Sequence, residues 1–189
     1  MVITTTFSMR RVLLWLTILL SVAQSASAAV PEYEVKAALI YKIGKFIRWP
    51  EHLFESSGGV LTLCILGRDE FGESIDALSG KRLQSQVIAI VRATQLDQLP
   101  ARCHIVFISR SESERLPALV GSLSRFPTLT VSDIDGFAAQ GGMIGFTVTA
   151  NKITFQINSA ACRRAGLEIG AQLLQLATLV TDGHPEQKQ

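Results

Sequence analysis

The side chains of this sequence that could do chemistry are three histidines, three cysteines and a few charged residues that follow apolar segments. His52 lies in a loop, His104 begins an apolar segment, and His184 lies in a polar C-terminal stretch. No two of them have metal-ligand spacing, and the Gly-x-Ser-x-Gly and His-Glu-x-x-His motifs are absent from the sequence. We therefore predict no catalytic residue, no metal and no cofactor, and we favour a buried structural role for His104 over a catalytic one.

Two cysteines lie in or beside apolar segments that are typical of buried strands. Cys64 belongs to the segment 60–66, and Cys103 begins the segment 103–108. Neighbouring strands place such residues within the distance that a disulfide bond can bridge. A disulfide also persists in an exported protein, and the N-terminus discussed below predicts export. A Cys64–Cys103 disulfide is therefore favoured, with two buried thiols as the alternative. By closing the chain between the two cysteines into a loop, the disulfide would contribute about 4 kcal/mol to stability.

The third cysteine, Cys162, stands near the start of a predicted helix beside Arg163 and Arg164. Neighbouring positive charges favour a thiolate, which would make this residue reactive or available for an intermolecular bond. A free cysteine is more often a small buried hydrophobic residue, and this second interpretation is favoured.

Charged residues follow three of the strand-like segments directly. Arg68, Arg110 and Asp133 each come within a few residues of the end of such a segment. In open α/β sheets, ligands bind beyond the carboxyl ends of the strands. These three residues are therefore candidates for holding a small carboxylate or an amino acid. The alternative is that they are ordinary solvated loop residues and helix caps.

The N-terminus has the order of features found in a secretory signal. Arg10 and Arg11 precede an apolar run of about 12 residues, which is shorter than a membrane span. The small residues 24–28 follow and end in Ala-Ser-Ala, so we expect cleavage after Ala28. An uncleaved membrane anchor is the less favoured alternative. The sequence thus predicts a cleavable signal peptide (1–28), one domain (29–182) and a flexible tail (183–189), with the product exported and no membrane insertion.

Removal of the predicted signal changes the charge balance. The whole chain has 18 lysines and arginines against 16 acids, and the signal contains two of the arginines and no acid. The mature chain is therefore neutral, so its net charge gives no electrostatic reason to bind nucleic acid or an anionic membrane.

The spacing of apolar residues along the chain predicts alternating strands and helices. The strand-helix alternation predicts an α/β fold with a mostly parallel sheet, helices on both faces and a C-terminal antiparallel hairpin at one edge. Ser111, with Glu114 three residues later, is the expected N-cap of the third helix. The expected helices span 32–49, about 71–78, 111–123 and from the cap at Asn158 or Ser159 to 180; the expected strands span 60–66, 86–91, 103–108, 126–131, 143–149 and 153–157.

Several segments of the chain, taken in their order, resemble the sequence pattern of the YfiR-like family. The match begins with the aromatic and basic stretch Tyr33–Pro50 and covers nearly all of the predicted mature chain. The other matching segments are Leu63–Asp69, Cys103–Ser109, Leu129–Asp133, Gly136–Ala138, Gly141–Ile144, Ile157–Ala161 and Ala165–Leu167.

The resemblance implies a periplasmic repressor. A family member of this kind binds the periplasmic sensor domain of an inner-membrane diguanylate cyclase and holds it inactive, which lowers cyclic di-GMP and biofilm formation. Cys64 and Cys103 match a disulfide pair of the family, whereas the second cysteine pair of some members, in the region 136–145, is missing here. The resemblance also allows a homodimer of this chain. The alternative function is a periplasmic domain that binds an amino acid or organic acid through Arg68, Arg110 and Asp133.

Overall fold

A computed structural model describes residues 31–55, 58–150, 152–182 and 184–185. The predicted signal peptide lies outside these residues, as does most of the predicted tail. No helix within the described ranges is long and apolar enough to cross a membrane.

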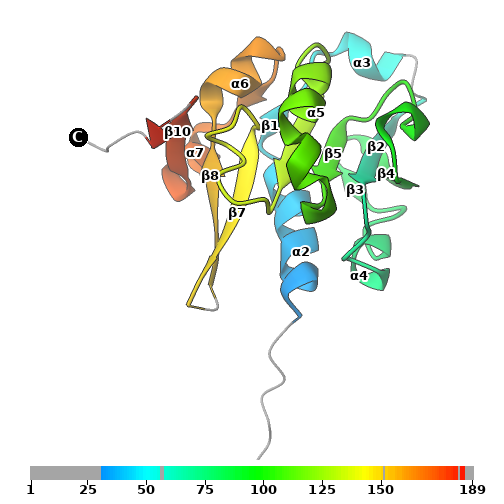
Figure 1. The fold of residues 1–189 in the computed structure, drawn as a ribbon. Helices are drawn as coiled ribbons and strands as arrows, with labels where there is room; N and C mark the ends of the chain where they lie inside the picture. The colour runs from blue at the N-terminus through cyan, green and yellow to red at the C-terminus, as the bar shows by residue number, and fades with distance from the viewer. Residues whose placement is uncertain (1–30, 56–57, 151, 183, 186–189) are drawn as a thin grey trace, which may run out of the picture. The chain divides into compact units, whose positions relative to one another are not determined.

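A nine-stranded sheet organises the described part of the chain (Figure 1). Its order is β11-β10-β8-β7-β6-β5-β2-β4-β3, and β4, β2, β5, β6 and β7 run parallel. A separate pair, β1 and β9, is antiparallel. The strands are β1 Ile47–Arg48, β2 Val60–Leu66, β3 Arg82–Leu83, β4 Gln86–Ala93, β5 Ile105–Ile108, β6 Leu129–Ser132, β7 Ile144–Thr149, β8 Lys152–Ile157, β9 Glu168–Ile169, β10 Thr178–Thr181 and β11 His184–Pro185.

Both faces of the sheet are covered, because its central strands are apolar on both sides. In β2, Leu63 and Ile65 pack in the core cluster that contains α2, whereas Cys64 and Leu66 pack in the cluster that contains α5. Buried parallel strands read as continuous apolar runs for this reason. The predicted α/β fold with helices on both faces is confirmed. The helical segments are α2 Glu32–Gly44, α3 His52–Glu55, α4 Glu73–Asp76, η1 Leu96–Gln98, η2 Arg110–Arg115, α5 Leu116–Leu123, α6 Ser159–Arg164 and α7 Ala171–Leu176.

The predicted C-terminal hairpin is present as β7 and β8, which are antiparallel over six residue pairs. Only the first two residues of β7 pair with β6, so most of the hairpin extends past its neighbour as a two-stranded ribbon (Figure 1). The sheet continues on the other side of β8 with β10, which runs parallel to it.

The first helix is shorter than predicted. The expected helix over 32–49 ends at Gly44, and Ile47 and Arg48 form β1 instead. These two residues pair with Ile169 and Glu168 of β9. The prediction failed at this end because the apolar spacing of Phe46 and Ile47 suits a helix, while the competing strand partner lies about 120 residues later in the chain.

The predicted single helix up to residue 180 is wrong. Asn158 caps a short helix, α6, through its side-chain oxygen, which accepts a hydrogen bond from the Ala161 N–H. The chain then turns at Gly166, whose φ of +71° is a left-handed conformation that suits glycine. Beyond this turn the chain forms β9, the six-residue helix α7 and the strand β10.

Two further helices differ from the sequence expectation. The helix expected over 71–78 is reduced to α4, after Gly72 with a φ of +52°. The third helix begins as the 3-10 segment η2, and its cap is Ser109, not Ser111: the Ser109 hydroxyl accepts from the Ser111 N–H.

Candidate functional site

The strand order creates a point where the chain reverses its direction across the sheet. The chain leaves β2 for β4 on one side and then returns to β5 on the other side of β2. The carboxyl ends of β2 and β5 flank this reversal, which is where open α/β sheets bind ligands.

In this protein the reversal point is filled by the protein itself. The Ser111 hydroxyl accepts a hydrogen bond of 2.9 Å from the Arg68 backbone N–H, which joins the loops that follow β5 and β2. Glu112 is buried there and pairs with Arg115. A Cβ atom on Gly67 would lie 2.5 Å from the Ser111 Oγ, so the two loops are in direct contact.

Gly67→Ala is expected to lower the free energy of unfolding by at least about 2 kcal/mol, because φ is +95° and the added methyl group overlaps Ser111. Gly80→Ala is the matched control, since Gly80 has a φ of +75° but no atom lies within 4 Å of an added Cβ. It should cost only about 1 kcal/mol. Urea unfolding measures the stability of both variants. Equal losses of stability would show that the contact between Gly67 and Ser111 is unimportant.

The next strand end carries a buried cluster of charges around Asp133. One carboxylate oxygen of Asp133, Oδ2, accepts from Lys36 Nζ at 2.5 Å and from the Tyr33 hydroxyl at 2.9 Å. The Arg110 Nε lies 3.3 Å from the same oxygen and donates to the Asp133 backbone carbonyl at 3.1 Å. Lys36 also pairs with Glu32. The cluster thus ties α2 to the loops that follow β5 and β6.

The surroundings of Tyr33 keep its hydroxyl protonated. Burial, followed by the charge and hydrogen bond of Asp133, raises the pKa of Tyr33, so its hydroxyl remains a donor at neutral pH. Lys36 also lies 4.2 Å above the centre of the Tyr33 ring. The Asp133 side chain is 1% exposed, and its other oxygen, Oδ1, has no hydrogen-bond partner among the described residues. The carboxylate is therefore neutralised from within the fold.

The structure brings together two of the three residues predicted for ligand binding. Arg110 and Asp133 are in contact, but the Arg68 side chain points elsewhere and pairs with Glu70 at 2.9 Å. Sequence reasoning missed Lys36 and Tyr33. Lys36 lies four residues before Ile40, about one helical turn, and this spacing was the available indication that Lys36 lies on the buried face of α2.

A surface pocket of about 400 Å³ opens beside Arg110. It presents a guanidinium, a hydroxyl, an amide and a carboxylate around one apolar side chain. Its lining residues are Arg110, Ser113, Ile134, Asp135 and Gln140.

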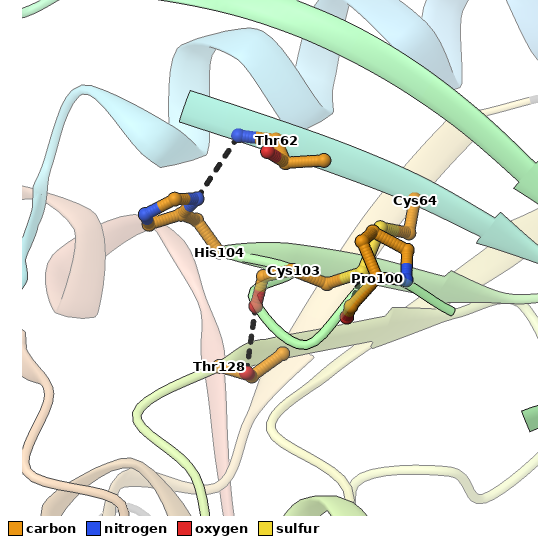
Figure 2. Close-up of a disulfide and its surroundings, with 6 residues drawn as sticks. All are labelled: Thr62, Cys64, Pro100, Cys103, His104 and Thr128. Atoms are coloured by element: carbon orange, nitrogen blue, oxygen red, sulfur yellow. Dashed lines mark hydrogen bonds between the residues drawn. A yellow bond between two sulfur atoms is a disulfide. The ribbon is translucent and has the colours of Figure 1, made fainter. Parts of the chain in front are cut away.

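The predicted disulfide is present and joins β2 to the segment that leads into β5. Cys64 and Cys103 are bonded, with their Cα atoms 6.0 Å apart, and both are buried (Figure 2). The Thr128 hydroxyl donates to the Cys103 carbonyl at 2.7 Å, which fixes the start of β5 against the residue before β6. An apolar pocket of about 190 Å³ adjoins Cys103 and is bordered by Phe126, which is 54% exposed.

His104 follows the disulfide and is held as a neutral ring. Its Nδ1 accepts a hydrogen bond of 2.9 Å from the Thr62 backbone N–H (Figure 2). The ring stacks on Phe54 of α3 at 5.0 Å. Burial and, secondarily, the charge of Arg102 lower the pKa of His104. The Nε2 atom has no hydrogen-bond partner within the described ranges. These contacts describe a structural histidine.

His104→Asn is expected to weaken the pH dependence of stability. Because the folded-state pKa of His104 lies below the value of about 6.5 for an unfolded histidine, the unfolded chain binds more protons below that pH. Stability therefore falls from about pH 7 towards the folded-state pKa, by at most about 1.4 kcal/mol per pH unit. The asparagine oxygen can still accept from Thr62 but does not titrate.

Urea midpoints between pH 7.5 and 5 measure this effect, with His52→Asn as the control because His52 is exposed. An unchanged slope in His104→Asn, or an equal change in His52→Asn, would contradict the assignment.

The remaining cysteine is buried, which agrees with the favoured interpretation of the sequence. Cys162 is a free thiol with no exposed surface, and it packs in the core cluster that contains α2. Burial raises its pKa to about 12 despite Arg163 and Arg164. A thiolate at this position is therefore strongly disfavoured at neutral pH.

Within the described ranges, no three histidine, cysteine or acidic side chains lie together in a way that could hold a metal ion. Residues 33–178 match a family model described as YfiR/HmsC-like. No curated protein matches the chain.

Proposed function

Because the chain belongs to the YfiR/HmsC-like family of periplasmic regulators, we propose that it binds the periplasmic sensor domain of an inner-membrane diguanylate cyclase and holds that enzyme inactive. Repression of this kind lowers cyclic di-GMP and, with it, biofilm formation. The family match over residues 33–178 is the observation that carries the proposal.

The site geometry supports a role in binding. The ionisable groups at the carboxyl edge of the sheet are engaged with one another: Lys36, Tyr33 and Arg110 all contact Asp133. The reversal point between β2 and β5 is closed by Ser111 against Gly67. These contacts favour a rigid domain whose surface is recognised by a partner.

The proposal includes export. The family match begins at residue 33, after the expected cleavage site at Ala28, which supports a mature periplasmic domain. We retain the division into a signal peptide (1–28), a domain (29–182) and a tail (183–189) as part of the proposal.

Cyclase activity in isolated membranes tests the repression. Membranes from the source strain lacking this chain are solubilised in mild detergent and supplied with GTP, and the protein purified after export is titrated in. Cyclic di-GMP synthesis should fall saturably with the folded protein and stay constant with the heat-unfolded protein. Constant synthesis with the folded protein, in membranes that show cyclase activity, would contradict repression.

A second candidate function is supported by the pocket beside Arg110. A small amino acid or organic acid could place its carboxylate on the Arg110 guanidinium, with Asp135 available for an ammonium group. Arg68 is not among the lining residues, and Asp133 is covered by its own partners. The proposed contact is therefore Arg110.

Thermal unfolding with added L-glutamate or succinate distinguishes this candidate, because a ligand at 100 times its Kd stabilises by about 2.7 kcal/mol. Arg110→Gln should abolish the shift, and Arg68→Gln, the matched control, should preserve it. No shift with either compound, or equal loss in both variants, would remove the candidate.

A further inference from the structure

Five exposed basic residues gather where the C-terminal end of α2 meets the edge of the sheet. Three come from α2 and the segment that follows it, and two come from residues 81–82, at the edge strand β3. We call this surface the basic face; it consists of Lys42, Lys45, Arg48, Lys81 and Arg82.

Direct contacts join the two parts of the basic face. The Tyr41 hydroxyl donates to the Arg82 carbonyl at 2.9 Å, and Lys45 Nζ lies 4.5 Å above the centre of the Tyr41 ring. Gln84 Nε2 donates to the Ile47 carbonyl at 2.7 Å. The end of α2 and the β3–β4 turn therefore form one continuous surface.

The positive charge of this surface is almost uncompensated. The sequence contains no acid from Ile40 to Pro50. Arg48 lies 3.7 Å from Glu168, and both side chains are largely exposed, so this pair is weak. The other four basic residues have no carboxylate partner within the described ranges. Because the predicted mature chain is neutral overall, this concentration of charge makes the molecule electrostatically asymmetric.

Apolar side chains are exposed beside these cations. Val87 is 37% exposed and lies directly opposite Arg82 in the antiparallel β3–β4 pair, so both side chains are on one side of the sheet. Phe46 is 36% exposed and lies between Lys45 and Arg48 in the chain. Interfacial helices that bind membranes likewise combine lysines and arginines with exposed aromatic and aliphatic side chains.

We propose that the basic face binds the anionic lipid headgroups of the membrane in which the cyclase is embedded. This inference rests on the proposed function for its biological setting. Each lysine or arginine near an anionic surface contributes about fivefold to membrane partitioning, and the attraction decays within about 10 Å at 0.1 M salt. The basic face would therefore hold the protein reversibly at the membrane surface and orient it towards its partner.

Vesicle cosedimentation tests the proposal with the protein purified after export. Vesicles of phosphatidylethanolamine and phosphatidylglycerol (3:1) should bind it at 20 mM salt, and vesicles of phosphatidylcholine should not. Binding should be lost at 300 mM salt. Lys42→Gln/Lys45→Gln should lower partitioning by about 25-fold, whereas Arg125→Gln/Lys152→Gln, which removes two exposed charges elsewhere, should leave it within about twofold.

Three results would overturn the proposal. The first is that the protein does not bind vesicles containing phosphatidylglycerol at low salt, and the second is that both double variants lose binding equally. The third is that Lys42→Gln/Lys45→Gln loses cyclase binding although the unchanged protein binds no vesicles. The last result would assign the face to an acidic protein surface. The vesicle assay contains no cyclase, so its outcome is independent of whether the chain represses one.

Discussion

Replacing Lys36 with methionine is expected to lower the free energy of unfolding by about 3–5 kcal/mol, because it breaks a buried ion pair by removing one partner. The Lys36 side chain has no exposed surface and donates to Asp133, which is 1% exposed. Methionine fills a similar volume, so the loss comes from the carboxylate left behind. Arg110 is 55% exposed and can compensate that charge only partly.

Two control variants test whether the loss in Lys36→Met comes from the broken ion pair. Lys42→Met, on an exposed position of the same helix, should change stability by less than about 0.5 kcal/mol. Lys36→Met/Asp133→Asn should be less destabilising than Lys36→Met, since the second change removes the uncompensated charge. Urea unfolding provides all three values. A loss in Lys36→Met no larger than that in Lys42→Met would show that the cluster does not stabilise the fold.

Removing the disulfide with Cys64→Ala/Cys103→Ala is expected to cost about 4 kcal/mol. The bond closes a loop between residues 39 positions apart, so its absence allows the unfolded chain many more conformations. Cys162→Ala is the control for losing a buried sulfur without losing a bond.

Reductant separates the bond from the packing of its sulfurs. Dithiothreitol should destabilise the unchanged protein and Cys162→Ala by similar amounts and should leave Cys64→Ala/Cys103→Ala unaffected. Equal urea midpoints for the unchanged protein with and without reductant, with complete reduction shown by thiol titration, would contradict the expected contribution.

The sheet could be predicted from the sequence because its central strands are buried on both faces. The apolar run of β2 marked its bounds, Val60–Leu66, and the alternation of Ile153–Ile157 after a turn marked the hairpin. Such signals are local, since each is contained in the segment that forms the element.

The C-terminal region could not be predicted in the same way. The apolar positions between residues 166 and 180 suit one long helix, but the chain instead forms β9, α7 and β10. The decisive interactions are long-range: β9 pairs with β1 and β10 pairs with β8. Sequence spacing within the segment contains no information about these partners.

The candidate site was partly predictable for the same physical reason. Arg110 and Asp133 follow adjacent parallel strands, so their proximity could be inferred from strand ends alone. The burial of Lys36 depends on Asp133, which lies 97 residues later. The basic face was only partly predictable. Lys42, Lys45 and Arg48 lie close together in the sequence, whereas Lys81 and Arg82 join them only through the fold.

Cyclic di-GMP in the source strain tests the central claim most directly. It should rise when this chain is deleted and return to its original level with a copy that retains residues 1–28, but not with a copy that lacks them. Unchanged cyclic di-GMP on deletion, with the partner cyclase shown to be expressed, or full restoration by the copy without residues 1–28, would contradict periplasmic repression.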